Sequence, residues 1–284
     1  MVISIKVQIM NLIKYIKKII YIIPIIILML FINGCSSKTI IDPYQYDDTN
    51  YKTGNMTFTE NVAKINVDWI VGDIIIDKSE TEEVIIREDI DVNIDDSLKM
   101  HYYLNNSLLD IKFCGNLEKI NYNFKIKKLY IYLPSDFLGM ININNISADI
   151  TINNVTIYNL NIKNVSGDID IEKVLMDKLD IDNTSGSILL FYSSINYIEI
   201  NSISGTIGLS YDTKPIQAAI NSTSGGISIY ISEKENIAFK FETVSGSFKT
   251  NLQYTKNQNK YTFNEGTLVL DIETVSGYLK VLKK

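Results

Sequence analysis

The chain has 284 residues, of which 46% are hydrophobic and 21% charged, a composition typical of globular proteins rather than disordered or collagenous ones. Its formal net charge is −6 and its one arginine is Arg87, which excludes a surface that reads nucleic-acid phosphates. One histidine, His101, and two cysteines, Cys35 and Cys114, are too few for a histidine-rich metal centre or a disulfide framework, and we expect no cofactor.

The N-terminal segment is typical of an export signal. Lys17 and Lys18 precede an apolar run over residues 19–32 that is short for a membrane span. The run ends in Ile32-Asn33-Gly34-Cys35, which resembles a bacterial lipobox; this resemblance implies cleavage before Cys35 and attachment of lipid to its thiol. An uncleaved anchor helix is the alternative. Either reading predicts an extracytoplasmic protein anchored to the cell envelope.

From residue 141 onward the chain repeats a serine-glycine turn. Seven copies occur, and the spacings between successive serines are 19, 19, 19, 20, 21 and 31 residues. Glycine after serine suits a sharp corner that needs positive φ or a close backbone approach. The turns are Ser147-Ala148, Ser166-Gly167, Ser185-Gly186, Ser204-Gly205, Ser224-Gly225, Ser245-Gly246 and Ser276-Gly277.

Alignment on the serine produces apolar columns six and four residues before it and three and five residues after it. Apolar and polar positions alternate within each copy, which predicts strands with one buried face. A single copy cannot bury its aliphatic side, so we expect each strand to pair with its equivalent in the next coil, about 4.8 Å away. The sequence therefore predicts an all-β fold, a parallel β-helix (β-solenoid) with an isoleucine-filled interior.

A polar column stands two residues before each serine and begins with Asn145, Asn164 and Asn183. Alternation aims these side chains inward, so we predict a hydrogen-bonded ladder at the corner.

The sequence divides into four predicted parts. They are a lipoprotein signal peptide (1–34), a polar tether (35–55), an irregular N-terminal β cap (56–140) and the solenoid with its seven repeats (141–284). Inside the cap, Gly72-Asp73-Ile74 matches Gly167-Asp168-Ile169, which indicates a degenerate copy over residues 65–76. Residues 251–264 are a polar insertion that lengthens the last spacing, either simply tolerated or used for binding.

Three features together resemble a known family. They are a strand ending in Leu133-Pro134, serial units of the form (Asn/Ser/Thr)-(Val/Ile/Thr)-Ser-Gly-x-Ile-x-Ile, and a closing Thr274-Val275-Ser276-Gly277. They look like the YvlB-like family of bacterial domains of unknown function, whose members are called "putative adhesins". The resemblance covers roughly residues 58–284. It implies a right-handed β-helix on an envelope protein, and it implies no catalytic residues.

Two carboxylates form the first candidate site. Asp149 and Asp168 stand two residues after the serine of neighbouring copies, so we expect them to stack on the outer face. Close carboxylates can bind calcium weakly or act as a glycosidase pair. Aspartate also favours corners for turn reasons alone, so a purely structural role remains open.

Tyrosines form the second candidate site. Tyr192 and Tyr211 stand seven residues after their serines and Tyr230 stands six after its own, so adjacent coils could present a tyrosine column as a ligand face. Flat amphipathic rings suit sugar faces and protein surfaces. A biased composition with 18 tyrosines, and the preference of tyrosine for exposed strands, is the alternative explanation.

The serine column lacks a base, because the one histidine lies outside the repeats, and we expect no enzymatic activity. The favoured hypothesis is an envelope-anchored, non-enzymatic binding or scaffold module, an adhesin. Its expected partners are the membrane, through the lipid anchor, and a glycan or surface protein, with no nucleic acid. The alternatives are a carbohydrate-active β-helix enzyme that uses the Asp149 and Asp168 region, and an envelope stress or sensory component.

Overall fold

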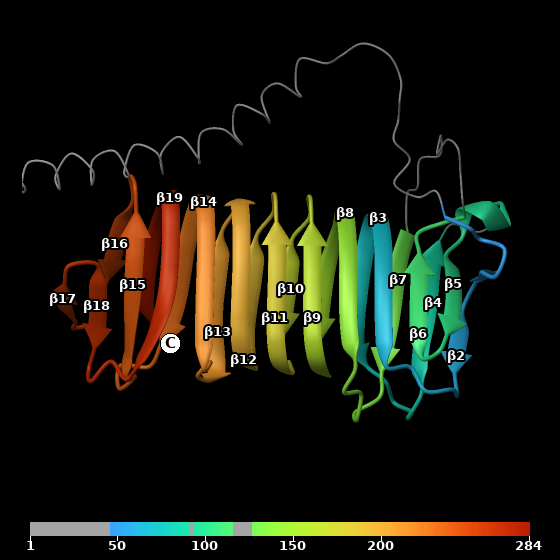
Figure 1. Cartoon of the computed structure of the whole chain (residues 1–284), viewed down its shortest axis with the longest axis horizontal. Coiled ribbons are helices and arrows are strands. Elements are labelled where there is room, and N and C mark those ends of the chain that lie inside the picture. Colours follow the sequence, from blue (N-terminus) through green and yellow to red (C-terminus); the bar gives the residue numbers. More distant parts are fainter. Residues whose placement is uncertain (1–45, 91–93, 116–126) are drawn as a thin grey trace, which may run out of the picture. The chain divides into compact units, whose positions relative to one another are not determined.

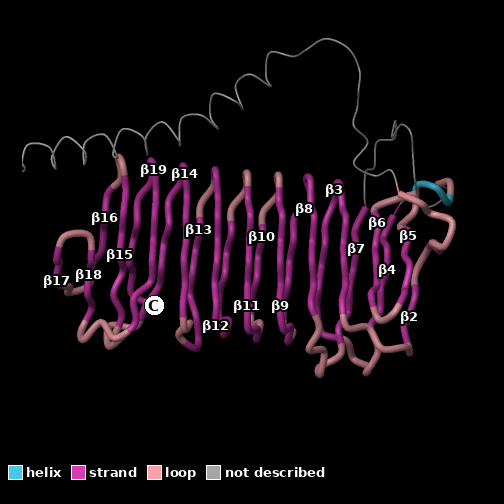
Figure 2. The backbone as a smooth tube through the Cα atoms, in the orientation of Figure 1, coloured by secondary structure: helices cyan, strands magenta, loops and turns pink. Residues whose placement is uncertain are grey.

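The computed structural model describes residues 46–90, 94–115 and 127–284. In these ranges the protein is all-β, with 19 strands in one hydrogen-bonded sheet and a single three-residue 3-10 helix, η1 (Asp96–Leu98). The strands stand side by side as repeated coils (Figures 1 and 2). The predicted signal peptide, with Cys35, lies outside the described residues.

Parallel strands one repeat apart form the middle of the domain. Ile150 pairs with Ile169, Ile169 with Ile188, and Ile188 with Ile207, so the apolar column three residues after the serine is a continuous row. The predicted coil-on-coil pairing is confirmed here. The strands are β8 (Met140–Asn153), β9 (Thr156–Asn164), β10 (Ile169–Glu172), β11 (Leu175–Asn183), β12 (Ile188–Ser204), β13 (Ile207–Thr213) and β14 (Gln217–Ile231).

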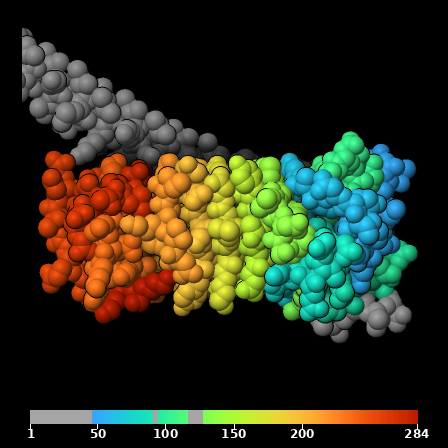
Figure 3. Space-filling view, turned by 90° about the horizontal axis from the view of Figure 1, so that it is seen from below, coloured from blue at the N-terminus to red at the C-terminus, as the bar shows by residue number. Residues whose placement is uncertain are grey.

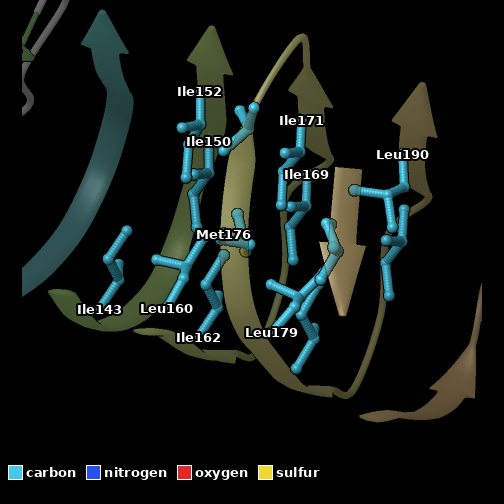
Figure 4. Close-up of a cluster of buried hydrophobic side chains, with 14 of the residues drawn as sticks. Ile143, Ile150, Ile152, Leu160, Ile162, Ile169, Ile171, Met176, Leu179 and Leu190 are labelled. Carbon is cyan, nitrogen blue, oxygen red and sulfur yellow. The ribbon is translucent and has the colours of Figure 1, made fainter. Parts of the chain in front are cut away.

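The interior between the strands is filled by the predicted aliphatic columns. Ile181 and Ile188 are both 0% exposed, and their equivalents in neighbouring coils are buried with them. Figure 4 shows this packing at Ile150, Ile169 and Leu160. Stacking is what makes the core possible, since each coil covers the aliphatic side chains of its neighbours.

The degenerate copy in the cap region is confirmed. β3 (Lys64–Lys78) pairs in parallel with β8 over its length, with Gly72 opposite Ala148 and Ile74 opposite Ile150. β3 is therefore one more coil of the stack, although some sixty residues of sequence separate it from the regular repeats.

The expectation that coils stack in sequence order is wrong at the C-terminal end. The last repeat, β19 (Leu268–Lys283), pairs with β14, so that Ser224 stands opposite Ser276. The Ser245 repeat, β15 (Ile237–Thr243) and β16 (Ser247–Thr250), lies on the far side of β19, with Thr243 opposite Thr274. The final strand is thus inserted between two earlier ones, as Figure 1 shows at the red end.

The residue 251–264 insertion closes this end rather than forming a free loop. It contains the hairpin β17 (Thr255–Asn257) and β18 (Lys260–Phe263), and β18 pairs antiparallel with β15. Tyr261 and Phe263 are buried; the Tyr261 ring stacks 3.8 Å from that of Phe248, and the Phe263 ring meets that of Phe239 at 5.8 Å. An aromatic hairpin therefore covers the edge that the parallel stack would leave exposed.

The N-terminal end is closed in the same way. β7 and β6 pair in parallel with β3, and antiparallel strands β4 and β5 then cover them. Two short strands complete this end: β1 pairs with β5 and β2 pairs with β4, both antiparallel. The strands of the N-terminal end are β1 (Lys52–Thr53), β2 (Met56–Phe58), β4 (Val84–Ile90), β5 (His101–Asn105), β6 (Leu108–Lys112) and β7 (Lys127–Leu133). One side of the domain, from this cap to the C-terminal coils, is a continuous surface in Figure 3.

A buried ion pair lies inside the N-terminal cap. The Lys127 side chain is 0% exposed and its Nζ pairs with the Glu88 carboxylate, which also accepts the Met100 amide at 2.9 Å. Lys127 Nζ donates to the Leu98 carbonyl at 2.8 Å and lies 4.4 Å from the centre of the Phe113 ring. Burial lowers the pKa of Lys127, while the Glu88 charge acts in the opposite direction.

Candidate functional site

The polar column at the corner is a structural ladder, as predicted. Asn145 Nδ2 donates to Asn164 Oδ1 at 2.6 Å, and Asn164 Nδ2 donates to Asn183 Oδ1 at 2.8 Å. Each amide also donates to a carbonyl of its own corner, for example Asn164 to Gly167 at 2.8 Å. All three amides are buried, so they stabilise the corners and are not available to a ligand.

The glycines that follow the serines are required by the geometry of these corners. Gly186 has φ +106°, and a Cβ built there would lie 2.1 Å from the Gly167 carbonyl oxygen of the preceding coil. The backbone of one corner thus lies directly against the next, and at Gly186 this leaves no room for a side chain. In the first copy Ala148 is fully buried at the same position. The glycine of the motif accordingly serves the packing of one coil against the next.

Asp149 and Asp168 lie on neighbouring coils, as expected, and both carboxylates bind backbone. Asp149 Oδ1 accepts the Asp168 amide at 2.8 Å, and Asp168 Oδ1 accepts the Ser187 amide at 2.7 Å. Burial, with the Asp168 and Asp149 charges, raises the pKa of nearby Asp170. In the described ranges no group of three or more histidine, cysteine, aspartate or glutamate side chains is arranged to hold a metal ion. Weak calcium binding at the pair stays a prediction.

The three predicted tyrosines do not form one outward column. Tyr192 is 51% exposed, whereas Tyr211 is 7% exposed and points inward. The reason is a difference at the second corner of the coil. Asn154, Lys173 and Tyr192 occupy this corner in three successive repeats with φ between 52° and 56°. The next repeat has one residue fewer at this corner and lacks the residue with positive φ. Tyr211 therefore pairs with Ser193, which is buried, and its side chain points inward.

Tyr211 is consequently part of the core. Its hydroxyl is buried with no hydrogen-bond partner in the described part of the chain, and burial raises its pKa. It cannot contact a ligand on the outer face.

The structure instead joins two of these tyrosines to residues that the sequence did not single out. The Phe191 ring lies 6.3 Å from that of Tyr192 and 6.0 Å, edge on, from that of Tyr230. We call the aromatic patch the outward set of Leu189, Phe191, Tyr192, Tyr230 and Tyr278, which lies on β12, β14 and β19.

Two glycines form the floor of the aromatic patch. A Cβ on Gly208 would lie 2.9 Å from Leu189 Cδ2 and 3.4 Å from Phe191 Cζ, and a Cβ on Gly226 would lie 2.0 Å from Tyr278 Cζ. The side chains of the patch therefore lie over glycine backbone on adjacent coils. This produces a broad, flat apolar surface in the middle of an otherwise polar face.

Lysines border the patch on its C-terminal side. Lys280 Nζ lies 4.4 Å from the Tyr278 ring centre, and Lys284 Nζ lies 5.5 Å from that of Tyr192. Lys284 Nζ also donates to the Tyr211 carbonyl at 2.8 Å and to Asp212 at 3.1 Å, which ties the C-terminus to the second corner. These cation–π contacts hold the rings in place from one side.

A second apolar feature follows the serine corner. The residue before the serine is an exposed aliphatic in several coils, including Val165 at 52% and Val244 at 68% exposed. These side chains make a ridge one residue wide, in contrast to the aromatic patch, which is three rows wide. The described ranges contain no helix long and apolar enough to span a membrane.

The family model described as Toastrack, DUF4097, matches residues 105–282, well over half of the chain. The chain belongs to this family. The predicted resemblance to a bacterial domain of unknown function called "putative adhesin" is thereby confirmed. The match includes β6 to β19, so the aromatic patch lies within the family domain.

Solved structures resemble the fold only distantly. A "putative lipid binding protein" from Parabacteroides distasonis ATCC 8503 has TM-score 0.46 and 16% identity, covering 82% of this chain and 97% of its own. A "putative adhesin" from Parabacteroides merdae ATCC 43184 has TM-score 0.43 and 14% identity, with the same two coverages. A "putative cell adhesion protein" from Clostridium sporogenes ATCC 15579 has TM-score 0.37 and 14% identity, covering 82% and 100%. Comparison with the curated proteins finds no match.

Proposed function

We propose that this protein is a non-enzymatic binding module of the cell envelope, in which a right-handed parallel β-helix presents the aromatic patch to a glycan or a surface protein. One observation carries the proposal: the Phe191 ring lies over Gly208 and meets the Tyr230 ring edge on at 6.0 Å, in an apolar surface on the outer face of the coils. The rings of the patch are only partly buried, so much of their apolar area is available to a partner.

The rigidity of the scaffold supports this role. Side chains on paired β-strands are held in fixed rows, so the patch loses little conformational entropy when it binds. Aromatic rings on such a surface suit the flat faces of sugars and the apolar centres of protein interfaces. The acidic corner residues Asp149 and Asp168 each bind a backbone amide, which favours a structural role for them over a catalytic one.

The anchor is the second element of the proposal. Cys35 is proposed to carry lipid, and about ten residues separate it from the first described residue, Tyr46. A tether of that length reaches at most about 35 Å, which would hold the domain close to the membrane surface. Loss of detergent-phase partitioning in Cys35→Ala is the expected result; partitioning that survives the substitution would contradict the lipid anchor.

The binding role is tested with the full chain in detergent solution against cell-wall glycans and surface proteins, with product analysis of every glycan. The double substitution Phe191→Ala, Tyr230→Ala should weaken binding about tenfold or more, as expected for aromatic anchors. Tyr158→Ala is the matched control, because Tyr158 is 52% exposed on β9, outside the patch. Equal loss in the control would remove the patch from the proposal. Release of sugar fragments that disappears in Asp168→Asn would establish an enzyme instead.

A further inference from the structure

The outward face that carries the aromatic patch changes charge from one end to the other. One row of aligned outward residues crosses the coils in the order Thr151, Asp170, Leu189, Gly208, Ser228, Lys280 and Lys249. The row carries one acidic residue, Asp170, before its apolar middle, and two basic residues, Lys280 and Lys249, after it. Asp149 and Asp168 flank Asp170 on the acidic side, and Lys283 and Lys284 follow Lys280 on the basic side.

The charged side chains on the two sides of the patch contact backbone amides or an aromatic ring but, among the described residues, form no ion pairs with one another or with other residues. In the described part of the chain, no ion pair involves Asp149, Asp168 or Asp170, and none involves Lys249 or Lys280. Asp170 and Lys249 are exposed. Unpaired charge of opposite sign at equal distances from an apolar centre is the pattern of a surface that is complementary to itself.

Gly208 stands at the centre of this pattern. Along the row, Leu189 separates Gly208 from Asp170 on one side, and Ser228 separates it from Lys280 on the other. Each charged residue is therefore two strands away from Gly208, a distance of about 10 Å. A two-fold axis that passes over Gly208, lies in the plane of the interface and runs at right angles to the row would place Asp170 of one copy opposite Lys280 of the other, twice. It would also place the aromatic patches of the two copies against each other.

We propose that the partner of the aromatic patch is a second copy of this chain, bound through this face in an antiparallel, two-fold arrangement. The inference rests on the proposed function, since it names the partner of the same surface. Leu189 and Phe191 lie over the buried Gly208 at the centre, so the apolar patch becomes the desolvated middle of the interface with Asp170–Lys280 pairs at its rim.

The size of the face predicts the strength of the contact. Seven coils spaced about 4.8 Å apart and three rows of outward side chains amount to about 500 Å² per copy, or about 1,000 Å² in all. This is at the small end for a specific interface, so we expect a weak, transient dimer. Attachment of both copies to a surface would strengthen it by raising their effective concentration.

The test is a charge exchange, read by sedimentation of the full chain in a density-matched detergent. Asp170→Lys and Lys280→Glu should each raise the dimer dissociation constant about tenfold, because each substitution places like charges opposite at two symmetric positions. The double variant Asp170→Lys, Lys280→Glu should return it to within about threefold of the original, since the pair is restored in reverse. Asp182→Lys, at an exposed position directly before the buried Asn183 and outside this face, is the control and should change nothing.

Three outcomes would overturn the dimer. They are a chain that stays monomeric at every concentration, a double variant that is no better than the single ones, and an Asp182→Lys variant that is equally impaired. The substitutions leave Phe191 and Tyr230 in place, so the binding of a glycan or another protein at the patch can still be measured in them. If that binding persists while no dimer forms, the proposed function stands and this inference alone fails.

Discussion

Lys127 and Glu88 form an ion pair that is sealed inside the N-terminal cap, beneath the rings of Trp69 and Phe113. The two side chains are 0% and 3% exposed. Lys127 lies on β7 and Glu88 on the antiparallel strand β4 that covers it, so the pair joins the last parallel coil to the layer that closes the stack. Taking either charge away would leave the other buried and uncompensated.

Glu88→Gln should therefore lower the free energy of unfolding by about 3 to 5 kcal/mol. Glu172→Gln is the matched control, because Glu172 forms an exposed pair with Lys173 at 2.7 Å and should cost less than about 1 kcal/mol. Urea unfolding followed by circular dichroism measures both. Similar, small losses in the two variants would show that the cap does not depend on its internal charge pair.

Stability should fall as the pH is lowered through the histidine range. Burial lowers the pKa of His101 below its unfolded value, so between the two values the unfolded chain binds more protons than the folded one. Stability then rises with pH up to about 6.5, the ordinary histidine pKa, and the contribution is lost below the lowered folded pKa. Unfolding titrations from pH 5 to 8 should show this slope in the original chain and a reduced slope in His101→Gln.

Gly186 offers a test of the corner geometry. Gly186→Ala would combine a strained φ of +106° with a Cβ placed 2.1 Å from the Gly167 carbonyl oxygen. Gly54→Ala separates the two effects, because Gly54 has φ +90° with nothing within 4 Å of the Cβ position. We expect about 1 to 2 kcal/mol of destabilisation in Gly54→Ala from strain alone, and clearly more in Gly186→Ala. Equal losses would mean that the corners can move apart.

The aliphatic columns make a prediction within one strand. Ile181→Ala removes a fully buried side chain and should cost about 2 to 5 kcal/mol, whereas Asp182→Ala at the next, exposed position should stay within about 0.5 kcal/mol. Thermal or urea unfolding separates the two. If Ile181→Ala proves as mild as its neighbour, the inward assignment of the column is incorrect.

The alternation of apolar and polar residues made much of the fold predictable from the sequence alone. Residues such as Ile169 and Ile188 alternate with polar ones at the period of a strand, and each repeat carries the same serine and glycine, so inward columns, corners and the Asn145–Asn164–Asn183 ladder were all predictable. These features depend on what a residue does within its own coil and on the presence of an identical coil beside it.

The tertiary structure alone decided the order of the coils and which aromatic side chains reach the surface. Every repeat presents the same pairing edge, so nothing local distinguishes Ser245 from Ser276 as the partner of Ser224. The choice depends on the residue 251–264 hairpin, which pairs with β15 at the end of the stack and allows β19 to lie between β14 and β15. Likewise, one residue fewer at a corner turns Tyr211 inward while Tyr192 stays outside. Because side chains alternate with period two, a shift of a single residue reverses the face, and only the pairing between strands shows where that shift occurs.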